Sequence, residues 1–201
     1  IMWFGTAYSK KTFQILFLIL GLWSIYEMWK LRKGKPKLVA LLIVIIPFFT
    51  IQFFVMGDLN YPDLPFNPSV ILLMFILTWT FDSFAYLVGK KLGKTKILPT
   101  ISPKKSWEGF FGGYLFCILA SSLSHFVFED YFNHISTLSY ILITIILPFT
   151  ATTGDFIESY YKRKAGVKDS GKIMPGHGGI LDRMDAFLIT IPVIYIIINI
   201  T

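Results

Sequence analysis

The residues of this sequence that could do chemistry gather in one polar run, 167–187 (VKDSGKIMPGHGGILDRMDAF). The run holds three aspartates, two lysines, an arginine, a histidine and four glycines, whereas the stretches around it are almost entirely apolar. Two of its acids, Asp182 and Asp185, are three residues apart, so a helix that begins here presents both on one face. Asp182 would also suit the N-cap of that helix, which is the simpler structural interpretation. The run therefore offers carboxylates, cations and a flexible backbone within one short segment.

Further carboxylates stand where an apolar environment makes them costly. Asp82 follows a long apolar stretch, and Asp155 ends another, within one helical turn of Glu158 and Ser159. An ionisable group inside a membrane normally faces a partner, a cavity or an ion, and a buried salt bridge or a protonated acid is the structural alternative. Carboxylates from several helices, without a Cys or His framework, favour Mg²⁺ over zinc. These acids therefore predict a magnesium site.

Basic residues and glycines accompany the acids. The Gly-His-Gly-Gly string at 176–179 has backbone N–H groups that can approach an anion closely, just ahead of the predicted helix. His177 is a lone histidine between glycines, which favours a hydrogen bond or a phosphate contact over a metal bond. The nearby cations are Lys104, Lys105, Lys162, Arg163, Lys168 and Arg183. Magnesium carboxylates beside cations and a glycine-rich turn indicate phosphoryl or nucleotidyl transfer.

The elements that must position these residues are membrane-spanning helices. The chain of 201 residues is 54% hydrophobic, and its 20 Phe, 10 Tyr and 5 Trp suit helices with aromatic belts at the membrane interfaces. Spanning segments must be helices or closed barrels, and the apolar runs here lack the alternation of barrel strands. We predict an all-α, polytopic integral membrane bundle with about six transmembrane helices, near 12–29, 38–56, 69–89, 107–128, 137–157 and 184–200.

Charge alternates between the connections of this bundle. Loops 30–37, 90–106 and 158–183 hold five, six and six Lys/Arg, whereas connections 57–68 and 129–136 hold none. Cytoplasmic loops are enriched in Lys and Arg, so we expect a multi-pass protein of the cell (inner) membrane whose polar active site faces the cytoplasm. Chemistry at that surface suggests an anionic lipid as one substrate. The net charge of +7 thus indicates topology, and we predict no nucleic-acid partner.

The polar block closely resembles the signature of the phosphatidate cytidylyltransferases, the CDP-diacylglycerol synthases. Every spacing of that signature is kept here, by Ser159, Lys162-Arg163, Lys168-Asp169, His177-Gly178-Gly179 and Asp182-Arg183-Met184-Asp185. Segments 81–113 and 154–159 are similar to two further family elements. The resemblance covers about 70–201, the expected catalytic domain, whereas 1–69 match only as amino-terminal transmembrane helices. Because that part is short for the family and begins at Ile1, we expect it to be truncated.

The resemblance implies that CTP condenses with phosphatidic acid, giving CDP-diacylglycerol and pyrophosphate for phospholipid biosynthesis, with Mg²⁺ required. It implies that Asp155 and Asp182 hold the metal, with Asp82, Asp169 and Asp185 as supporting ligands or as residues that orient the ligands. A second, monovalent cation stays an option. The lipid phosphate would attack the α-phosphorus of CTP directly, so no protein nucleophile is needed.

The same resemblance supplies the other expected site residues. Those expected to act in catalysis, besides the metal-binding acids, are Lys168, Asp169, His177, Arg183 and Asp185. Those expected to bind substrate are Lys104, Lys105, Ser159, Lys162, Arg163, Gly178 and Gly179.

Three alternatives to this function differ in what they predict. A cytidylyltransferase acting on another lipid phosphate, such as a prenol phosphate, would keep the same site. An ion-coupled transporter would spread polar residues along several spans, whereas the ionisable groups here gather at the predicted cytoplasmic ends. A CDP-alcohol phosphotransferase needs an Asp-Gly-x2-Ala-Arg motif, which the sequence lacks. For assembly, a homodimer is one candidate state.

Overall fold

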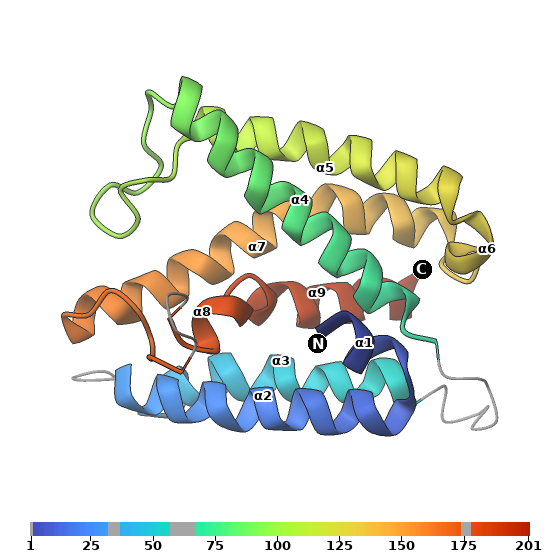
Figure 1. Cartoon of the computed structure of the whole chain (residues 1–201), viewed down its shortest axis with the longest axis horizontal. Helices are drawn as coiled ribbons and strands as arrows, with labels where there is room; N and C mark the ends of the chain where they lie inside the picture. The colour runs from blue at the N-terminus through green and yellow to red at the C-terminus, as the bar shows by residue number, and fades with distance from the viewer. Residues whose placement is uncertain (1, 32–36, 57–66, 174–177) are drawn as a thin grey trace.

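The computed structural model describes residues 2–31, 37–56, 67–173 and 178–201 (Figure 1). Apart from one isolated bridge between Lys96 and Ser106, the regular structure in these ranges is helical. The helices are α1 (Met2–Ala7), α2 (Lys10–Leu31), α3 (Lys37–Met56), α4 (Ser69–Leu92), α5 (Trp107–Val127), α6 (Glu129–Phe132), α7 (Thr137–Ala165), α8 (Leu181–Met184) and α9 (Phe187–Ile200).

Five stretches in the described residues are long and apolar enough to cross a membrane. They are α2, α4, α5, α7 and the segment Leu181–Ile200, which contains α8 and α9; a shorter apolar helix covers Leu38–Phe54 within α3. Large apolar side chains face outward, such as Phe126 with 88% of its surface exposed, which suits contact with lipid. The chain is therefore a multi-pass membrane protein, and the prediction of a polytopic helical bundle is confirmed.

Glycines allow the backbones of α4 and α5 to approach closely, and the two helices run side by side (Figure 1). A Cβ atom at Gly109 would lie 2.6 Å from the carbonyl oxygen of Ala85, and one at Gly113 would lie 2.7 Å from that of Phe81. Such distances leave no room for a side chain. Small residues at these positions therefore bring the two helices together, as is common between membrane helices.

Local signals set the ends of the helices beside the polar connections. Ser106 is the N-cap of α5 and accepts a hydrogen bond from the N–H of Gly109 at 3.2 Å. Glu108, in the first turn of α5, accepts one from the N–H of Thr95 at 3.0 Å and so closes the connection 93–106 onto the helix. Gly166 ends α7 with φ +71°, a left-handed conformation that favours glycine.

The two basic connections that the structure describes lie at the same end of the bundle, with the carboxyl-terminal ends of α2, α4 and α7 (Figure 1). Arg163 joins them, because its Nε donates to the carbonyl oxygen of Ile101 at 3.3 Å and its terminal nitrogen to that of Val167 at 3.0 Å. Helix α6 and the last residue, Thr201, lie at the opposite end. Two basic connections at one end of the bundle are the arrangement that the alternating charge of the loops predicts.

Candidate active site

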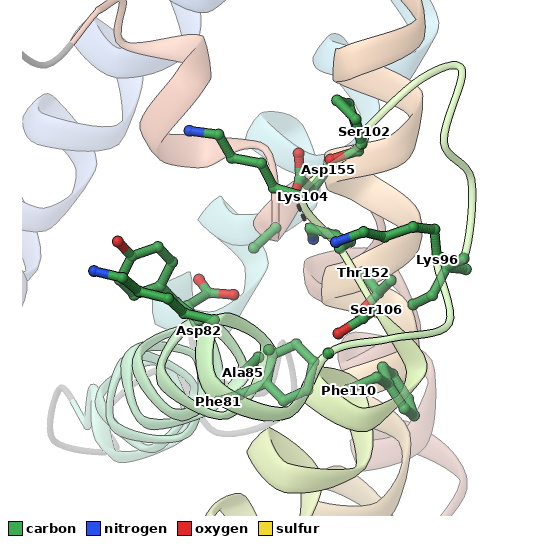
Figure 2. A pocket seen from close by; sticks show the side chains of 18 of the residues that line it. Phe81, Asp82, Ala85, Lys96, Ser102, Lys104, Ser106, Phe110, Thr152 and Asp155 are labelled. Atoms are coloured by element: carbon green, nitrogen blue, oxygen red, sulfur yellow. Dashed lines mark ion pairs between the residues drawn. The ribbon is translucent and has the colours of Figure 1, made fainter.

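A cavity of about 630 Å³ lies between α4, α5, α7, α8 and the connection 93–106. Figure 2 shows Asp82 of α4 and Asp155 of α7 on different sides of it, with Lys96 and Lys104 carried by the connection. Its charged lining residues are Asp82, Asp155, Asp182 and Asp185 together with Lys90, Lys96, Lys104 and Lys105. Phe81 and Phe110 add apolar surface. The cavity can thus receive a molecule with both an anionic and an apolar part.

Three carboxylates meet beside this cavity. Asp155 and Glu158 lie one turn apart on α7, Asp185 follows α8, and one oxygen from each lies within 4.8 Å of the others. Glu158 has no exposed surface, and the partner that the structure describes for its carboxylate is Lys162, in an ion pair. A fully buried carboxylate beside two further acids fits a divalent cation, because hard cations take oxygen ligands and their charge offsets the cost of burying the acids. The residues present therefore fit the expected metal.

Two lysines balance part of the negative charge of this cluster. Lys105, from the connection 93–106, forms an ion pair with Asp155. Lys162, one turn after Glu158 on α7, forms an ion pair with Glu158 and another with Asp182, where its Nζ lies 2.8 Å from Oδ1. Lys162 is almost buried, so these pairs are shielded from solvent. Opposite charges thus hold the cluster together from two sides.

Asp182 organises the segment that follows α7. Its Oδ2 accepts hydrogen bonds from the N–H of Ser170 at 2.8 Å, the N–H of Gly179 at 2.7 Å and the hydroxyl of Ser170 at 3.0 Å. Gly178 adopts φ +83°, and a Cβ there would lie 2.5 Å from the same oxygen. Because its own N–H is engaged by Asp182, Gly179 does not offer that group to an anion. The metal-binding role of Asp182 stays a prediction.

The acids and lysines nearest the cavity are the predicted residues that the structure brings together. Asp155 and Asp185 share the carboxylate cluster, and Asp82 lines the same cavity. Lys104 and Lys105 also line it. Ser159 and Lys162 lie within α7 beside the cluster, the hydroxyl of Ser159 donating to Asp155 Oδ1 at 3.2 Å.

Other predicted residues lie further out. Lys168 and Asp169 are exposed in the segment after α7, and Arg183 is exposed on α8. Arg163 is exposed and contacts backbone carbonyl groups of both connections. His177 lies outside the described residues. The roles expected of these residues in catalysis or substrate binding stay predictions.

Some residues of the site escaped the sequence interpretation. The sequence indicates Glu158 only as a neighbour of Asp155. The two residues are three positions apart, so both lie on one face of α7. Lys90 and Lys96, which the sequence explains by topology alone, line the cavity. Glu27 accepts hydrogen bonds from the segment 170–181. The signal for Glu27 was present, because an acid near the end of an apolar span needs the same explanation as Asp82.

Comparison with known proteins agrees with this chemistry. A family model described as the cytidylyltransferase family matches residues 1–201. A phosphatidate cytidylyltransferase of Rickettsia felis is 37% identical over 203 residues, covering 98% of this chain and 84% of that protein. That of Rickettsia bellii is 35% identical, covering 94% and 80%, and that of Staphylococcus aureus is 47% identical over 128 residues, covering 64% and 48%. The chain therefore belongs to the cytidylyltransferase family.

Proposed function

We propose that this chain transfers a cytidylyl group from CTP to phosphatidic acid at the cavity between α4, α5, α7 and α8. The products are CDP-diacylglycerol and pyrophosphate. The names of the relatives from Rickettsia and Staphylococcus support the reaction. The observation that carries the location is the carboxylate cluster of Asp155, Glu158 and Asp185 beside a cavity lined with lysines.

Direct transfer needs no covalent intermediate on the protein. A phosphate oxygen of the lipid forms a bond to the α-phosphorus of CTP, while the bond from that phosphorus to the oxygen bridging the β-phosphate breaks and pyrophosphate leaves. Negative charge therefore grows on the leaving group, where fixed cations help most. Lys90, Lys96 and Lys104 line the cavity and can contact these phosphates. Lys105 keeps the Asp155 carboxylate in place.

Mg²⁺ is the cation that we assign to the cluster, because its candidate ligands are carboxylate oxygens. Asp155, Glu158 and Asp185 would hold it, and Asp82 and Asp182 stand at the same cavity as further acids. When bound, the ion neutralises charge on the phosphates of CTP and on the leaving pyrophosphate. A second, monovalent cation remains part of the proposal only as an option beside these acids.

The cavity is placed on the cytoplasmic side of the cell membrane in this proposal. The connections 93–106 and 166–173 carry four and two lysines and lie at the end of the bundle where the cavity is found (Figure 1). Cytoplasmic loops of membrane proteins are enriched in such residues. CTP would then enter from the cytoplasm, and the lipid substrate from the adjoining leaflet.

The test follows labelled CTP into the lipid fraction with the protein purified in detergent. Phosphatidic acid is compared with a prenol phosphate, each across a Mg²⁺ titration. Asp155→Asn should lower the rate about 100-fold or more, because a bound metal ion lowers the barrier by several kcal/mol. The control is Asp130→Asn, an exposed acid at the opposite end of the bundle, which should keep the full rate.

Each outcome bears on a separate part of the proposal. Product from the prenol phosphate alone would replace the lipid substrate while keeping the site. An Asp155→Asn variant as active as the control would overturn the site. A folded wild-type protein that moves no label from CTP to either lipid would overturn the function.

A further inference from the structure

Glu27 of α2 is a buried acid that the proposed reaction does not use. Its side chain has only 2% of its surface exposed, near the carboxyl-terminal end of α2. A buried carboxylate is costly unless donors surround it, so its partners show what it does. Most of those that the structure describes come from one distant segment, 170–181.

Ser170, Ile180 and Leu181 donate hydrogen bonds to the Glu27 carboxylate. The hydroxyl of Ser170, which is 143 residues away in the chain, donates to Oε2 at 2.7 Å. The N–H of Leu181 donates to Oε2 at 2.8 Å, and the N–H of Ile180 donates to Oε1 at 3.2 Å. Trp23, one turn earlier on α2, donates from its indole nitrogen to Oε1 at 3.0 Å. Glu27 thus binds the segment at both of its ends.

The backbone of the segment also fits closely around this carboxylate. A Cβ added at Gly171 would lie less than 3.0 Å from Oε1 of Glu27, and one added at Gly179 would lie less than 3.0 Å from Oε2. Real Cβ atoms essentially never come so close to another atom. A side chain at either position would therefore have to displace the Glu27 carboxylate.

A continuous series of contacts leads from Glu27 to the carboxylate cluster. The hydroxyl of Ser170 lies within hydrogen-bond distance of Glu27 Oε2 and of Asp182 Oδ2, so its one hydrogen is shared between the two acids. Asp182 forms an ion pair with Lys162, which forms another with Glu158. Glu158 is the fully buried member of the cluster. A shift of Ser170 would therefore change the position of the Glu158 carboxylate through Asp182 and Lys162.

We propose that Glu27 is a positioning residue for cytidylyl transfer, which holds residues 170–171 and 179–181 so that Asp182 and Lys162 set the Glu158 carboxylate for the metal. This inference rests on the proposed function for its link to catalysis. Glu27 does not touch the substrate or the cluster, and its effect passes through Ser170 and Asp182. Residues that orient metal ligands in this way typically change metal affinity or activity about 10- to 100-fold when they are replaced.

The main variant is Glu27→Gln, which keeps the shape of the side chain but turns one acceptor oxygen into an NH₂ donor. That donor would face an N–H or O–H of the segment 170–181, since both oxygens accept from it. The matched control is Trp23→Phe, which removes the described Glu27 bond that comes from α2 itself. Ser170→Ala serves as the second variant, because it breaks the bridge to Asp182 without altering α2.

Two readouts separate positioning from general stability. The first is direct binding of Mn²⁺, used as a paramagnetic substitute for Mg²⁺ and followed by electron paramagnetic resonance on folded protein in detergent. The second is the Mg²⁺ concentration that gives half of the maximal transfer rate. We expect Glu27→Gln to raise both the Kd for Mn²⁺ and the half-maximal Mg²⁺ concentration about 10- to 100-fold. Ser170→Ala should raise both by a smaller factor, and Trp23→Phe should change each less than about threefold.

Unchanged Mn²⁺ binding in folded Glu27→Gln would overturn the proposal, even if the thermal stability of the variant fell. If Glu27→Gln does not fold, Ser170→Ala decides, and wild-type Mn²⁺ binding in that variant would overturn it as well. Failure of the proposed function is recognised separately, since the wild-type protein would then bind Mn²⁺ without transferring label from CTP to lipid.

Discussion

Gly154, directly before Asp155 on α7, is the position where one added methyl group should do most harm to the site. A Cβ there would lie less than 3.0 Å from the carbonyl oxygen of Asp185, and 3.2 Å from its carbonyl carbon. This oxygen is fixed backbone that accepts from the N–H of Leu188 at 3.2 Å. Since ordinary contacts begin near 3.4 Å, α7 and the start of α9 would have to separate by roughly 1 Å.

The effects on stability and on activity should differ in size. Overpacking of this kind costs about 1–3 kcal/mol, but alanine is favoured over glycine in a helix by about 1 kcal/mol, which offsets part of that cost. The free energy of unfolding of Gly154→Ala should therefore fall by only about 0–2 kcal/mol. Activity has no such compensation, because the same shift separates Asp155 from Asp185. A displacement of about 1 Å in a catalytic site can lower the rate about 100-fold.

The assay measures transfer of labelled cytidylate to phosphatidic acid across a Mg²⁺ titration, beside thermal unfolding of the same preparation. Thr153→Ala is the control, since Thr153 is exposed and its hydroxyl bonds the Phe149 carbonyl oxygen of its own helix. We expect the control to stay within about twofold of wild type. A Gly154→Ala protein that is folded and has the wild-type rate and Mg²⁺ response would refute the close packing inferred between α7 and Asp185.

Two further predictions concern the connection 93–106. Lys105→Gln removes the ion pair with Asp155 and should lower kcat/KM for CTP about 10- to 100-fold. Lys91 is exposed and lies outside the cavity lining, so Lys91→Gln should have little effect. Equal activity of the two variants would contradict the assigned role of Lys105. Glu108→Ala removes the acceptor of the Thr95 N–H, so amide hydrogen exchange at Thr95 should speed up several-fold, and unchanged exchange would show that the connection is closed by other contacts.

Local features of the sequence were enough to predict the helical bundle and part of its site. Long apolar runs predict the spanning helices, because backbone groups in lipid must be satisfied within the segment. The i, i+3 spacing brings Asp155 and Glu158 to one face of α7, although only Asp155 was singled out as a ligand. Asp185 was expected beside the metal and lies in the carboxylate cluster. In each case the pattern spans one helical turn or one apolar run, so neighbouring residues contain the information.

Contacts between distant helices could not be predicted in the same way. Glu27 meets a segment 143 residues later, and the apolar residues of α2 lie all round the helix, so the sequence shows neither which face is buried nor what covers it. The expected division into 1–69 and 70–201 stays a prediction, yet Glu27 contributes hydrogen bonds across that boundary. The assignment of Asp182 to the metal likewise came from the resemblance, whereas its hydrogen bonds to Ser170 and Gly179 depend on how the segment folds back.

The polar segment 167–179 needs these carboxylates because it has little apolar surface with which to pack. A segment with four glycines and two lysines cannot offset the entropy of ordering by hydrophobic burial, so hydrogen bonds hold its described residues Ser170 and Gly179. Glu27 and Asp182 supply acceptors for its backbone and for Ser170, and bonds to charged groups are the stronger kind. Asp182 is also linked to the cluster, because Lys162 forms ion pairs with both Asp182 and Glu158. Holding the segment and binding the metal are therefore coupled through shared side chains, and Lys162 stands between the two.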